Sequence, residues 1–563
     1  MSQVSKRVIA AGFQNHPKAA KLVQDALSPS AELDFAEILV NQDSARGAAA
    51  LVIGPAFDFD SDVACQIALN CIEDGTNLVI IGLPCQADSP FWQEFIGAKP
   101  LFSKPAGEWF FNIGSSCSLS ARLPEEFAAS GQLTVLEPRG DSQVLLSTSI
   151  AFRNYATATI SHHLGSTICV LGLAPTSDHV SEDLASLIRR AAMIGQEPAK
   201  GLHIGSLGVG IVGYGPFGGM GTYHATAVAE TEGMHLVAVV DSDAERRSAA
   251  LHDFPDARAY ATAEEMAQDD EVDIAVIATP PISHASLSLA LLDAGKHVIS
   301  EKPMCLSLRE ARLLIDKASA KNRMFSVNQN RRWDSDFRSI IYAVEGGSIG
   351  SLFNIETFVG GFEHPCRAWH SEESISGGAV FDWGSHHVDQ ITQLYGSAPA
   401  KVSASQHKRV WHDVTNVDQI RVHMLWEDGR EAEFFQSDIA AIRKPKYFIQ
   451  GTKGTIIGNY RPIVEETVSL PFGYEEREHH YAEAPAALRL SRYESGIGLV
   501  EESMPLARKQ RFAFHKNVAD HLLLGEPLAV RPESVAGVIA TLEAAQLSAT
   551  TDSQYVKLSE VEC

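Results

Sequence analysis

Near its middle the chain reads Leu207-Gly-Val-Gly-Ile-Val-Gly213-Tyr-Gly215-Pro-Phe-Gly218, and this stretch is the strongest indication of the fold class. A short apolar run opens onto the spacing G-x-G-x-x-G, and a helical pattern follows over residues 222–230. In a strand–loop–helix unit, the first glycine allows a tight turn, the second lets a pyrophosphate approach the backbone, and the third lets the helix pack on the strand. The helix N-terminus then favours the negative charge of the phosphates. We therefore predict a dinucleotide site at Gly213, Gly215, Pro216, Phe217 and Gly218.

The next apolar run predicts which dinucleotide binds. Residues 235–240 form this run, and Asp241 ends it at the position where an acid can bind the ribose hydroxyls. An acid there repels a 2′-phosphate, so the sequence favours NAD over NADP. Arg246 and Arg247 follow closely and keep NADP open as the less favoured cofactor.

Length and composition describe an ordinary globular protein. With 563 residues the chain is long enough for about three to four domains, and 45% of its residues are hydrophobic. A net charge of −24 argues against nucleic acid or an anionic membrane as a partner. No apolar run reaches transmembrane length, and the apolar run at 8–13 is too short for a signal peptide. The eight cysteines lack C-x-x-C or metal-ligand spacing, so we expect no metal and a reducing cytoplasm.

The pattern of apolar runs predicts an α/β protein with three domains. Residues 1–195 alternate short β-rich runs with helical stretches, and 196–204 form a polar linker. Residues 205–328 continue the dinucleotide-binding pattern as a Rossmann domain. The pattern of residues 329–563 predicts an α/β domain with a large, open, mainly antiparallel sheet. Within this domain, residues 461–510 are expected to form a long loop or arm. The strands expected in that sheet cover 353–358, 401–406, 419–426, 431–436 and 447–450.

Three further motifs carry chemistry. They read Ala278-Thr-Pro-Pro281-Ile-Ser-His284, Ser300-Glu301-Lys302-Pro303 and Gly377-Gly-Ala-Val-Phe-Asp382-Trp-Gly-Ser-His386-His-Val-Asp389. The first two follow strands of the parallel sheet, whose carboxyl ends form the ligand crevice, so Lys302 is placed to face a nicotinamide. Asp382 and His386 are four residues apart and would share one face of a helix.

Together these motifs resemble the Gfo/Idh/MocA oxidoreductase family over about 205–563. The family pattern has three glycines where this chain has Ser376-Gly-Gly. The resemblance implies a homodimer or homotetramer built through the open sheet. It makes Lys302 the lysine that contacts substrate hydroxyl and cofactor, His386 the acid/base histidine, and Asp382 a substrate-binding or orienting carboxylate. The remaining cofactor contacts that it implies are Thr279, Pro280, His284 and Glu301.

Several alternatives stand beside these roles. Arg332 and Trp333 follow the last Rossmann strand, and either bind substrate or pack between domains. His284 suits a structural role at the start of a helix. Asp382 and His386 could cap or salt-bridge a helix. A metal site formed with His387 and Asp389 is disfavoured, because the four side chains cannot share one helix face.

The first domain resembles the ThuA-like branch of class I glutamine-amidotransferase-like domains. The resemblance lies in Ser89-Pro-Phe-Trp-Gln-Glu-Phe-Ile-Gly97 and Ser161-His-His-Leu-Gly165, with the strand and glycine turn that follow. It implies a flavodoxin-like fold. Cys85, His179 and Glu182 do not match the required nucleophile elbow and histidine–acid register, so we expect the domain to be non-catalytic.

These observations predict an NAD(P)-dependent oxidoreductase. Hydride would move between nicotinamide and a secondary alcohol of a sugar, sugar derivative or cyclitol. One alternative is a glycoside hydrolase or lyase that oxidises its substrate transiently and retains NAD. Another is a sensor that binds NAD and sugar without turnover, although the presence of Lys302, Asp382 and His386 speaks against it.

Overall fold

The computed structural model describes most of the chain and divides it into two compact units. Unit 1 comprises Met1–Gly205 and Ala519–Pro527, and unit 2 comprises Ser206–Val518 and Leu528–Cys563. The described residues are 6–28, 31–36, 48–59, 61–84, 93, 95–114, 119–120, 123–124, 126–151, 153–163, 166–177, 181–193, 206–215, 219–366, 368–461, 466–469, 475–478 and 484–561.

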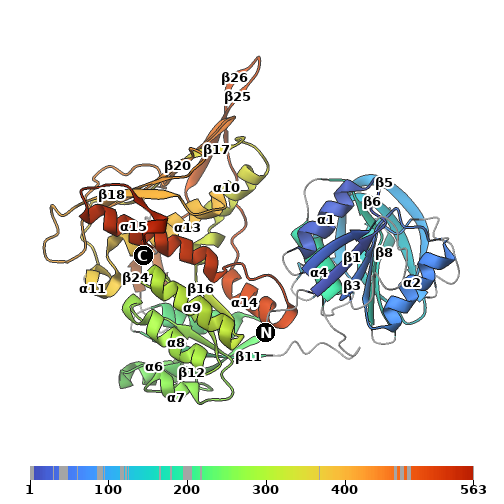
Figure 1. The fold of residues 1–563 in the computed structure, drawn as a ribbon, viewed down its shortest axis with the longest axis horizontal. Coiled ribbons are helices and arrows are strands. Elements are labelled where there is room, and N and C mark those ends of the chain that lie inside the picture. Colours follow the sequence, from blue (N-terminus) through green and yellow to red (C-terminus); the bar gives the residue numbers. More distant parts are fainter. Residues whose placement is uncertain are drawn as a thin grey trace. The chain divides into compact units, whose positions relative to one another are not determined.

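Unit 1 is built on a flavodoxin-like parallel sheet (Figure 1). Its parallel strands lie in the order β2-β1-β3-β4-β9, which is the flavodoxin order. The strands are β1 (Lys6–Ala11), β2 (Ala31–Ala36), β3 (Ala50–Ile53), β4 (Asn77–Ile81) and β9 (Ser166–Leu171).

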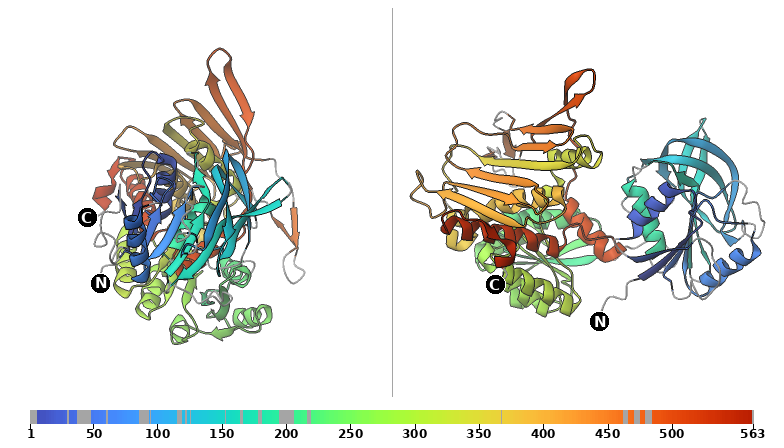
Figure 2. Two further views of the ribbon diagram at one scale, coloured as in Figure 1. Left: turned by 90° about the vertical axis from the view of Figure 1, so that its right-hand side faces the viewer. Right: turned by 45° about the horizontal axis from the view of Figure 1, so that its top comes forward.

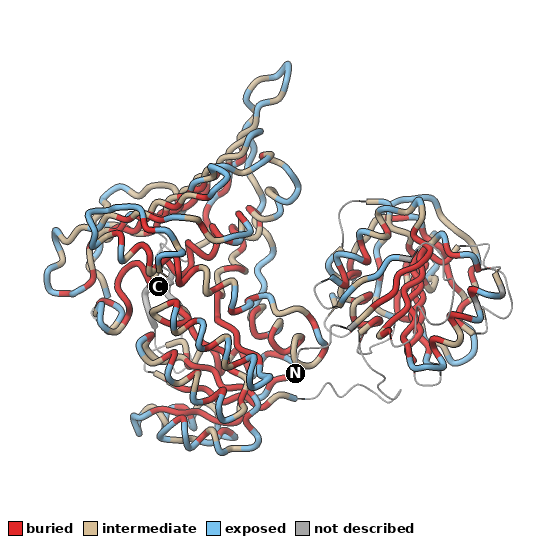
Figure 3. The backbone as a smooth tube through the Cα atoms, in the orientation of Figure 1, coloured by how far each residue is buried: buried red, intermediate tan, exposed pale blue. Residues whose placement is uncertain are grey.

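Each face of this sheet has its own apolar core, because successive side chains of a strand point to opposite faces. Val8 and Ala10 of β1 join the core that contains α1 (Pro17–Leu27) and α4 (Glu182–Met193). Ile9 and Ala11 join the other core, with α2 (Asp62–Glu73). Figure 3 shows these central strands as buried. The continuous apolar runs in the sequence follow from this burial on both faces.

The second half of the unit 1 sheet has no counterpart in the sequence-based prediction. Its antiparallel strands are β5 (Ala98–Ile113), β6 (Glu126–Pro138), β7 (Gln143–Ile150), β8 (Arg153–His163) and β10 (Leu173–Pro175). The β5–β6 register shifts at 100–102 and again at 104–107. These bulges interrupt the alternation of apolar and polar residues by which a half-buried strand is recognised.

Cys85 and His179, which do not match an amidotransferase site in the sequence, lie outside the described residues. The absence of amide chemistry in unit 1 therefore stays a prediction.

Unit 2 contains the predicted Rossmann fold. Six parallel strands lie in the order β13-β12-β11-β14-β15-β16, which corresponds to the Rossmann order 3-2-1-4-5-6. The strands are β11 (Leu207–Val212), β12 (Met234–Val240), β13 (Arg258–Tyr260), β14 (Ile274–Ile277), β15 (His297–Ser300) and β16 (Phe325–Val327). The helices are α5 (Met220–Glu230), α6 (Ala244–Asp253), α7 (Ala263–Ala267), α8 (His284–Asp293) and α9 (Leu308–Lys321).

The rest of unit 2 is a nine-stranded sheet with helices on one face (Figure 2). Neighbouring strands within this sheet run antiparallel, except for the parallel pair β17–β20. The long helix α15 (Pro532–Thr550) contacts α9 of the Rossmann layer as well as β18 and α13 (Gly384–Tyr395). The strands are β17 (Leu352–Gly360), β18 (Lys401–His407), β19 (Gln419–Leu425), β20 (Glu431–Ser437), β21 (Tyr447–Gly451), β22 (Gly454–Asn459), β25 (Ala487–Glu494), β26 (Gly498–Ser503) and β27 (Val556–Lys557).

The segment predicted as a loop or arm contains strands. The hairpin β25–β26 pairs with β22 and extends beyond the body of unit 2 (Figure 1). The strands β23 (Glu466–Ser469) and β24 (Glu475–Glu478) form a separate antiparallel pair. Among the described residues, no helix combines the length and the apolar character needed to cross a membrane.

The close approach of α5 to the glycine loop depends on Gly221, a residue that the sequence pattern did not identify. A Cβ atom at Gly221 would lie 2.2 Å from the carbonyl oxygen of Gly213 and 2.5 Å from that of Tyr214. Both are backbone atoms, so neither can move without shifting the loop. Gly221 therefore determines how near the helix comes to the loop.

We predict that Gly221→Ala destabilises unit 2 by about 1–3 kcal/mol, the usual range for overpacking. Calorimetric melting of the full chain measures this loss as a lower melting temperature. Gly361→Ala is the matched control, because a Cβ there would meet no atom within 4 Å and Gly361 does not have a left-handed φ. Equal melting temperatures for the two variants would contradict the assignment.

Candidate active site

The glycine loop has the conformation that a dinucleotide-binding turn needs. Gly213 and Gly215 have φ angles of +92° and +74°, a region that favours glycine. The carboxylate of Asp241 accepts hydrogen bonds from the backbone N–H groups of Tyr214 (3.1 Å) and Gly215 (3.2 Å). These bonds tie the loop to the end of β12. Pro216, Phe217 and Gly218 lie outside the described residues.

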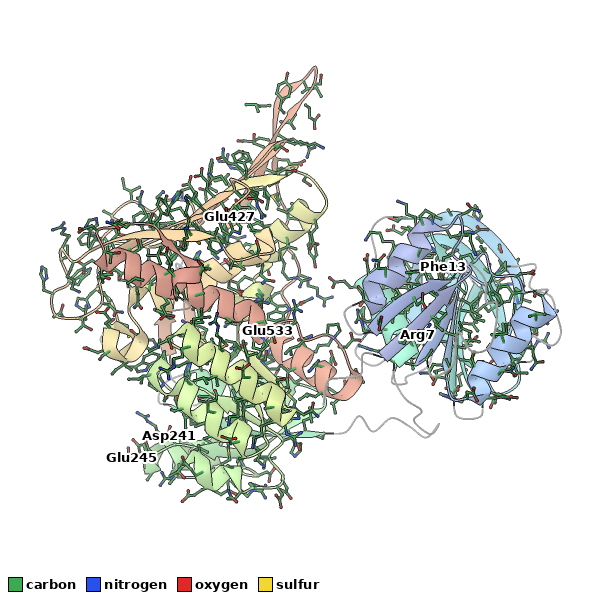
Figure 4. The ribbon with its side chains drawn as sticks, in the orientation of Figure 1. Arg7, Phe13, Asp241, Glu245, Glu427 and Glu533 are labelled. Carbon is green, nitrogen blue, oxygen red and sulfur yellow. The ribbon has the colours of Figure 1, made fainter. Side chains whose placement is uncertain are left out.

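Asp241 lies at the carboxyl end of β12, where an acid can meet a ribose (Figure 4). Its Oδ1 atom accepts a hydrogen bond from the N–H of Asp243 at 3.0 Å. The Arg246 guanidinium lies 3.8 Å from the same oxygen, whereas Arg247 donates to the carbonyl oxygens of Asp241 and Ser242. The positive-φ glycines and this acid fit an adenine dinucleotide, and Arg246 lies within ion-pairing distance of the carboxylate.

The turn that contains Thr279 and Pro280 supports the glycine loop from behind. A Cβ atom on Gly213 would lie 2.9 Å from the methyl carbon of Thr279. His284 is fully buried, and its two ring nitrogens lie 2.7 Å from the carbonyl oxygens of Pro303 and Thr279. Burial lowers the pKa of His284, and this effect outweighs the hydrogen bonds to the two carbonyl groups, which would raise the pKa. His284 therefore lies between the two turns, where a neutral ring donates a hydrogen bond to one carbonyl oxygen at a time, and this position suits its structural alternative.

The central contact of the site joins Lys302 to Asp382. The Lys302 ammonium donates a hydrogen bond of 2.7 Å to Oδ1 of Asp382, and both side chains are partly exposed. Burial alone would raise the pKa of Asp382, but the charge of Lys302 outweighs it and lowers this pKa. The carboxylate is therefore charged at neutral pH and holds the lysine at the carboxyl end of the Rossmann sheet.

Asp382 and His386 do not lie on one continuous helix. The short helix α12 (Ala379–Asp382) ends at Asp382, and α13 begins at Gly384. Trp383 between them keeps helical backbone angles (φ −78°, ψ −30°), so the chain continues in nearly the same direction. The four-residue spacing therefore still brings both side chains to the region of Lys302, whose charge affects each of their pKa values.

His386 is a buried, neutral imidazole. Its Nδ1 atom has no hydrogen-bond partner within the described parts of the chain, and its ring lies against Trp383. Burial lowers the pKa of His386 well below 6.5, and the charges of Lys302, Arg331, His387 and Lys446 lower it further. A neutral imidazole can accept a proton, which is what a base for an alcohol requires.

Glu301 lies in a buried network that the sequence did not predict. Its carboxylate accepts hydrogen bonds from Asn328 (2.7 Å) and from the backbone N–H of Lys302 (3.0 Å), and contacts Nε2 of His224 at 2.9 Å. His224, on α5, also contacts His515 at 2.8 Å. The network connects the cofactor helix to the lysine turn. Its members are too far apart in sequence for any local pattern to reveal it.

Arg332 and Trp333 have the geometry of packing residues. The Arg332 guanidinium makes a buried two-point ion pair with Asp389, at 2.8 and 2.6 Å, and donates to the carbonyl of Ala529. Trp333 packs edge-on against Phe514. This arrangement favours the packing interpretation, and we leave both residues out of the proposed site. Among the described residues, no cluster of histidine, cysteine or acidic side chains could hold a metal.

Two further titratable residues lie near Asp382. Burial lowers the pKa of His370, although Asp382 opposes this shift. Burial raises the pKa of Asp438 to about 7, and Asp382, Asp418 and Glu363 add to the increase. Neither residue belongs to a recognisable motif, and both are brought to Asp382 by the second sheet and its loops.

Comparison with known proteins places these residues in a family. Residues 207–329 match the oxidoreductase family with an NAD-binding Rossmann fold, and 342–558 match its C-terminal alpha/beta domain. The chain is 26% identical to scyllo-inositol 2-dehydrogenase (NADP(+)) IolW of Bacillus subtilis, over 61% of this chain and 94% of that protein. It is 23% identical to 1,5-anhydro-D-fructose reductase of Ensifer adhaerens, over 58% and 92%.

A solved structure agrees with this assignment. The NAD-binding protein from Listeria innocua is 29% identical and has a TM-score of 0.54, covering 64% of this chain and 98% of that one. The matched residues contain the glycine loop, Lys302, Asp382 and His386. The chain therefore belongs to the Gfo/Idh/MocA oxidoreductase family, with its NAD(P)-binding Rossmann domain and its C-terminal α/β domain both in unit 2.

Proposed function

We propose that the chain is an NAD-dependent dehydrogenase that interconverts a secondary alcohol and a ketone on a sugar, sugar derivative or cyclitol. The observation that carries the proposal is the 2.7 Å contact between Lys302 and Asp382, beside the buried neutral His386. The names of the inositol dehydrogenase and the anhydrofructose reductase support a polyhydroxylated substrate. Dimers or tetramers and a cytoplasmic location remain predictions.

Each of the proposed residues has a separate role in alcohol oxidation. A bound nicotinamide supplies the hydride acceptor. Lys302 donates a hydrogen bond to the substrate oxygen, and Asp382 fixes the direction of that donor. The neutral His386 takes the hydroxyl proton as the C–H bond breaks and the C=O bond forms. In the reductive direction, protonated His386 returns this proton to the oxygen.

A substrate panel tests the proposal directly. Pyranosides, aldonates and inositols are incubated with NAD or NADP, and the absorbance of the reduced cofactor is followed. Net reduction with a neutral polyol is the expected result. NAD that is retained through purification without net reduction would favour the transient-redox alternative.

We predict that Lys302→Ala and His386→Ala each lower kcat by about 10²–10⁴, the range for acid–base groups. Affinity for NAD, measured by calorimetry, should remain nearly unchanged. Asp382→Asn should lower kcat and raise KM, because it frees Lys302 from its charged partner. Lys321→Ala, at an exposed position on α9, is the control. Turnover within a few-fold of the parent would show that the substituted residue is misassigned.

The pKa of His386 predicts the pH dependence of alcohol oxidation. Because this pKa lies well below 6.5, the imidazole stays neutral at neutral pH and becomes protonated only at lower pH. We expect kcat to be constant from neutrality down to pH 6.5 and to fall only well below that pH. The pKa of Asp438 is about 7, so Asp438 could add its own change in kcat near that pH. Such a change would be lost in Asp438→Asn, whereas the change caused by His386 would remain. An acid limb centred at or above 6.5 would contradict the neutral-base role.

The cofactor preference should depend on Asp241. We expect NAD to bind about tenfold or more tightly than NADP, a difference of about 1.4 kcal/mol. Asp241→Ala should weaken NAD binding and narrow the preference, because it removes the ribose acceptor and the bonds to the glycine loop. Glu245→Gln, in the exposed first turn of α6, controls for the local loss of negative charge. Equal affinities in the parent protein would contradict the assignment.

A further inference from the structure

Unit 2 contains a hollow that the proposed chemistry does not use. Its volume is about 430 Å³, within the range of small-molecule sites. The hollow is bounded by the segment 368–375 and by the loop between β18 and β19. Its lining residues are Ala368, Trp369, Glu372, Ile375, Asp413 and Val414.

The lining combines an aromatic ring, two carboxylates and small apolar groups. The His370 ring stacks on one face of the Trp369 indole, with centroids 3.7 Å apart. Trp369 is at the same time one of the residues that line the hollow. A pyranose has an apolar C–H face and a rim of hydroxyl donors. An indole suits the face, and carboxylates such as Glu372 and Asp413 accept hydrogen bonds from the rim.

The two walls of the hollow are connected by hydrogen bonds. The backbone N–H groups of Thr415 and Asn416 donate to the carbonyl of Ser371, and the Asn416 amide donates to that of His370. The Thr415 hydroxyl donates to Glu372 at 3.2 Å. The loop itself is folded around buried Asp418, which accepts hydrogen bonds from three consecutive backbone N–H groups, those of residues 409–411. The hollow is therefore part of the folded structure and not a gap between loose loops.

The segment that carries Trp369 also carries His370, which the charges of the proposed reaction centre affect. Trp369 lines the hollow, and the next residue, His370, is close enough for the charges of Asp382 and Lys302 to change its pKa. A ring bound at Lys302 and a second ring in the hollow would thus both lie near the segment that carries His370. A single pyranose or cyclitol would leave the hollow unused.

We propose that the hollow beside Trp369 is a second carbohydrate subsite, so that the preferred substrate is a disaccharide or other glycoside. This inference rests on the proposed function for the ring that is oxidised. Trp369 packs against the second ring, and Glu372 and Asp413 accept hydrogen bonds from its hydroxyls. Both oxygens of Asp413 also lie 3.0 Å from Nε2 of His364, and Glu372 also accepts from Thr415, so the sugar uses the further lone pairs of these carboxylates. Trp369, Glu372 and Asp413 are specificity-determining residues that do not touch the reacting carbon.

Calorimetry on the full chain without added cofactor tests the subsite independently of redox chemistry. Maltose, cellobiose and lactose are compared with glucose and galactose. At least one disaccharide should bind about tenfold more tightly than its component monosaccharides. Trp369→Ala should reduce this advantage to about threefold or less, and Trp369→Phe should keep most of it. Glu372→Gln should also reduce the advantage of the disaccharide. Its control is Glu427→Gln, because Glu427 is an exposed residue in the β19–β20 turn and is labelled in Figure 4.

The outcomes distinguish the two proposals. Selective disaccharide binding without cofactor reduction by any sugar would support the subsite and overturn the dehydrogenase assignment. Reduction with monosaccharides but no disaccharide preference would overturn the subsite and leave the chemistry intact. A preference that survives in Trp369→Ala would also overturn the subsite. If Trp369→Ala does not fold, Glu372→Gln and Asp413→Asn test the subsite instead. An undiminished preference for the disaccharide in both variants would overturn the subsite.

Discussion

The ion pair between Lys302 and Asp382 joins the two layers of unit 2 at the point where chemistry is proposed. Lys302 follows a Rossmann strand, whereas Asp382 ends a helix that precedes the second sheet. The attraction outweighs the cost of burying the carboxylate, since the pKa of Asp382 is lowered. The same positive charge helps to keep His386 neutral. One contact thus directs a hydrogen-bond donor, and its positive charge adds to the effect of burial, which is the main reason that the pKa of His386 is low.

Buried polar pairs around this contact fix how the two layers of unit 2 pack against each other. Glu301 receives hydrogen bonds from Asn328 and from the backbone of Lys302, and it contacts His224 on the cofactor helix. Arg332 is paired with Asp389 on α13, and Lys446 with Asp336. A buried charge that loses its partner is strongly destabilising, so each pair disfavours other arrangements of the layers. This is why an arginine beside the site is better explained by packing than by substrate binding.

The second sheet adds what the Rossmann layer lacks. Its loops bring Asp438 and His370 to Asp382, and they form the wall that carries Trp369. Because the Rossmann layer supplies the cofactor residues, differences in these loops can change the substrate without altering hydride transfer. In the proposed assignment, the cofactor residues and the residues that select the substrate therefore lie on different elements of one unit.

The parallel layers and the candidate site residues could be predicted from local sequence patterns. Buried parallel strands are short continuous apolar runs, and the glycine loop and the motifs around Lys302, Asp382 and His386 are local in sequence. The antiparallel strands β5–β8 escaped prediction, since bulges in β5–β6 break their alternation. Only the tertiary structure revealed His224, His370, Asp438 and the Arg332–Asp389 pair. Their partners are distant in sequence, and a buried charge or histidine acquires its role from whatever the fold places within hydrogen-bonding distance.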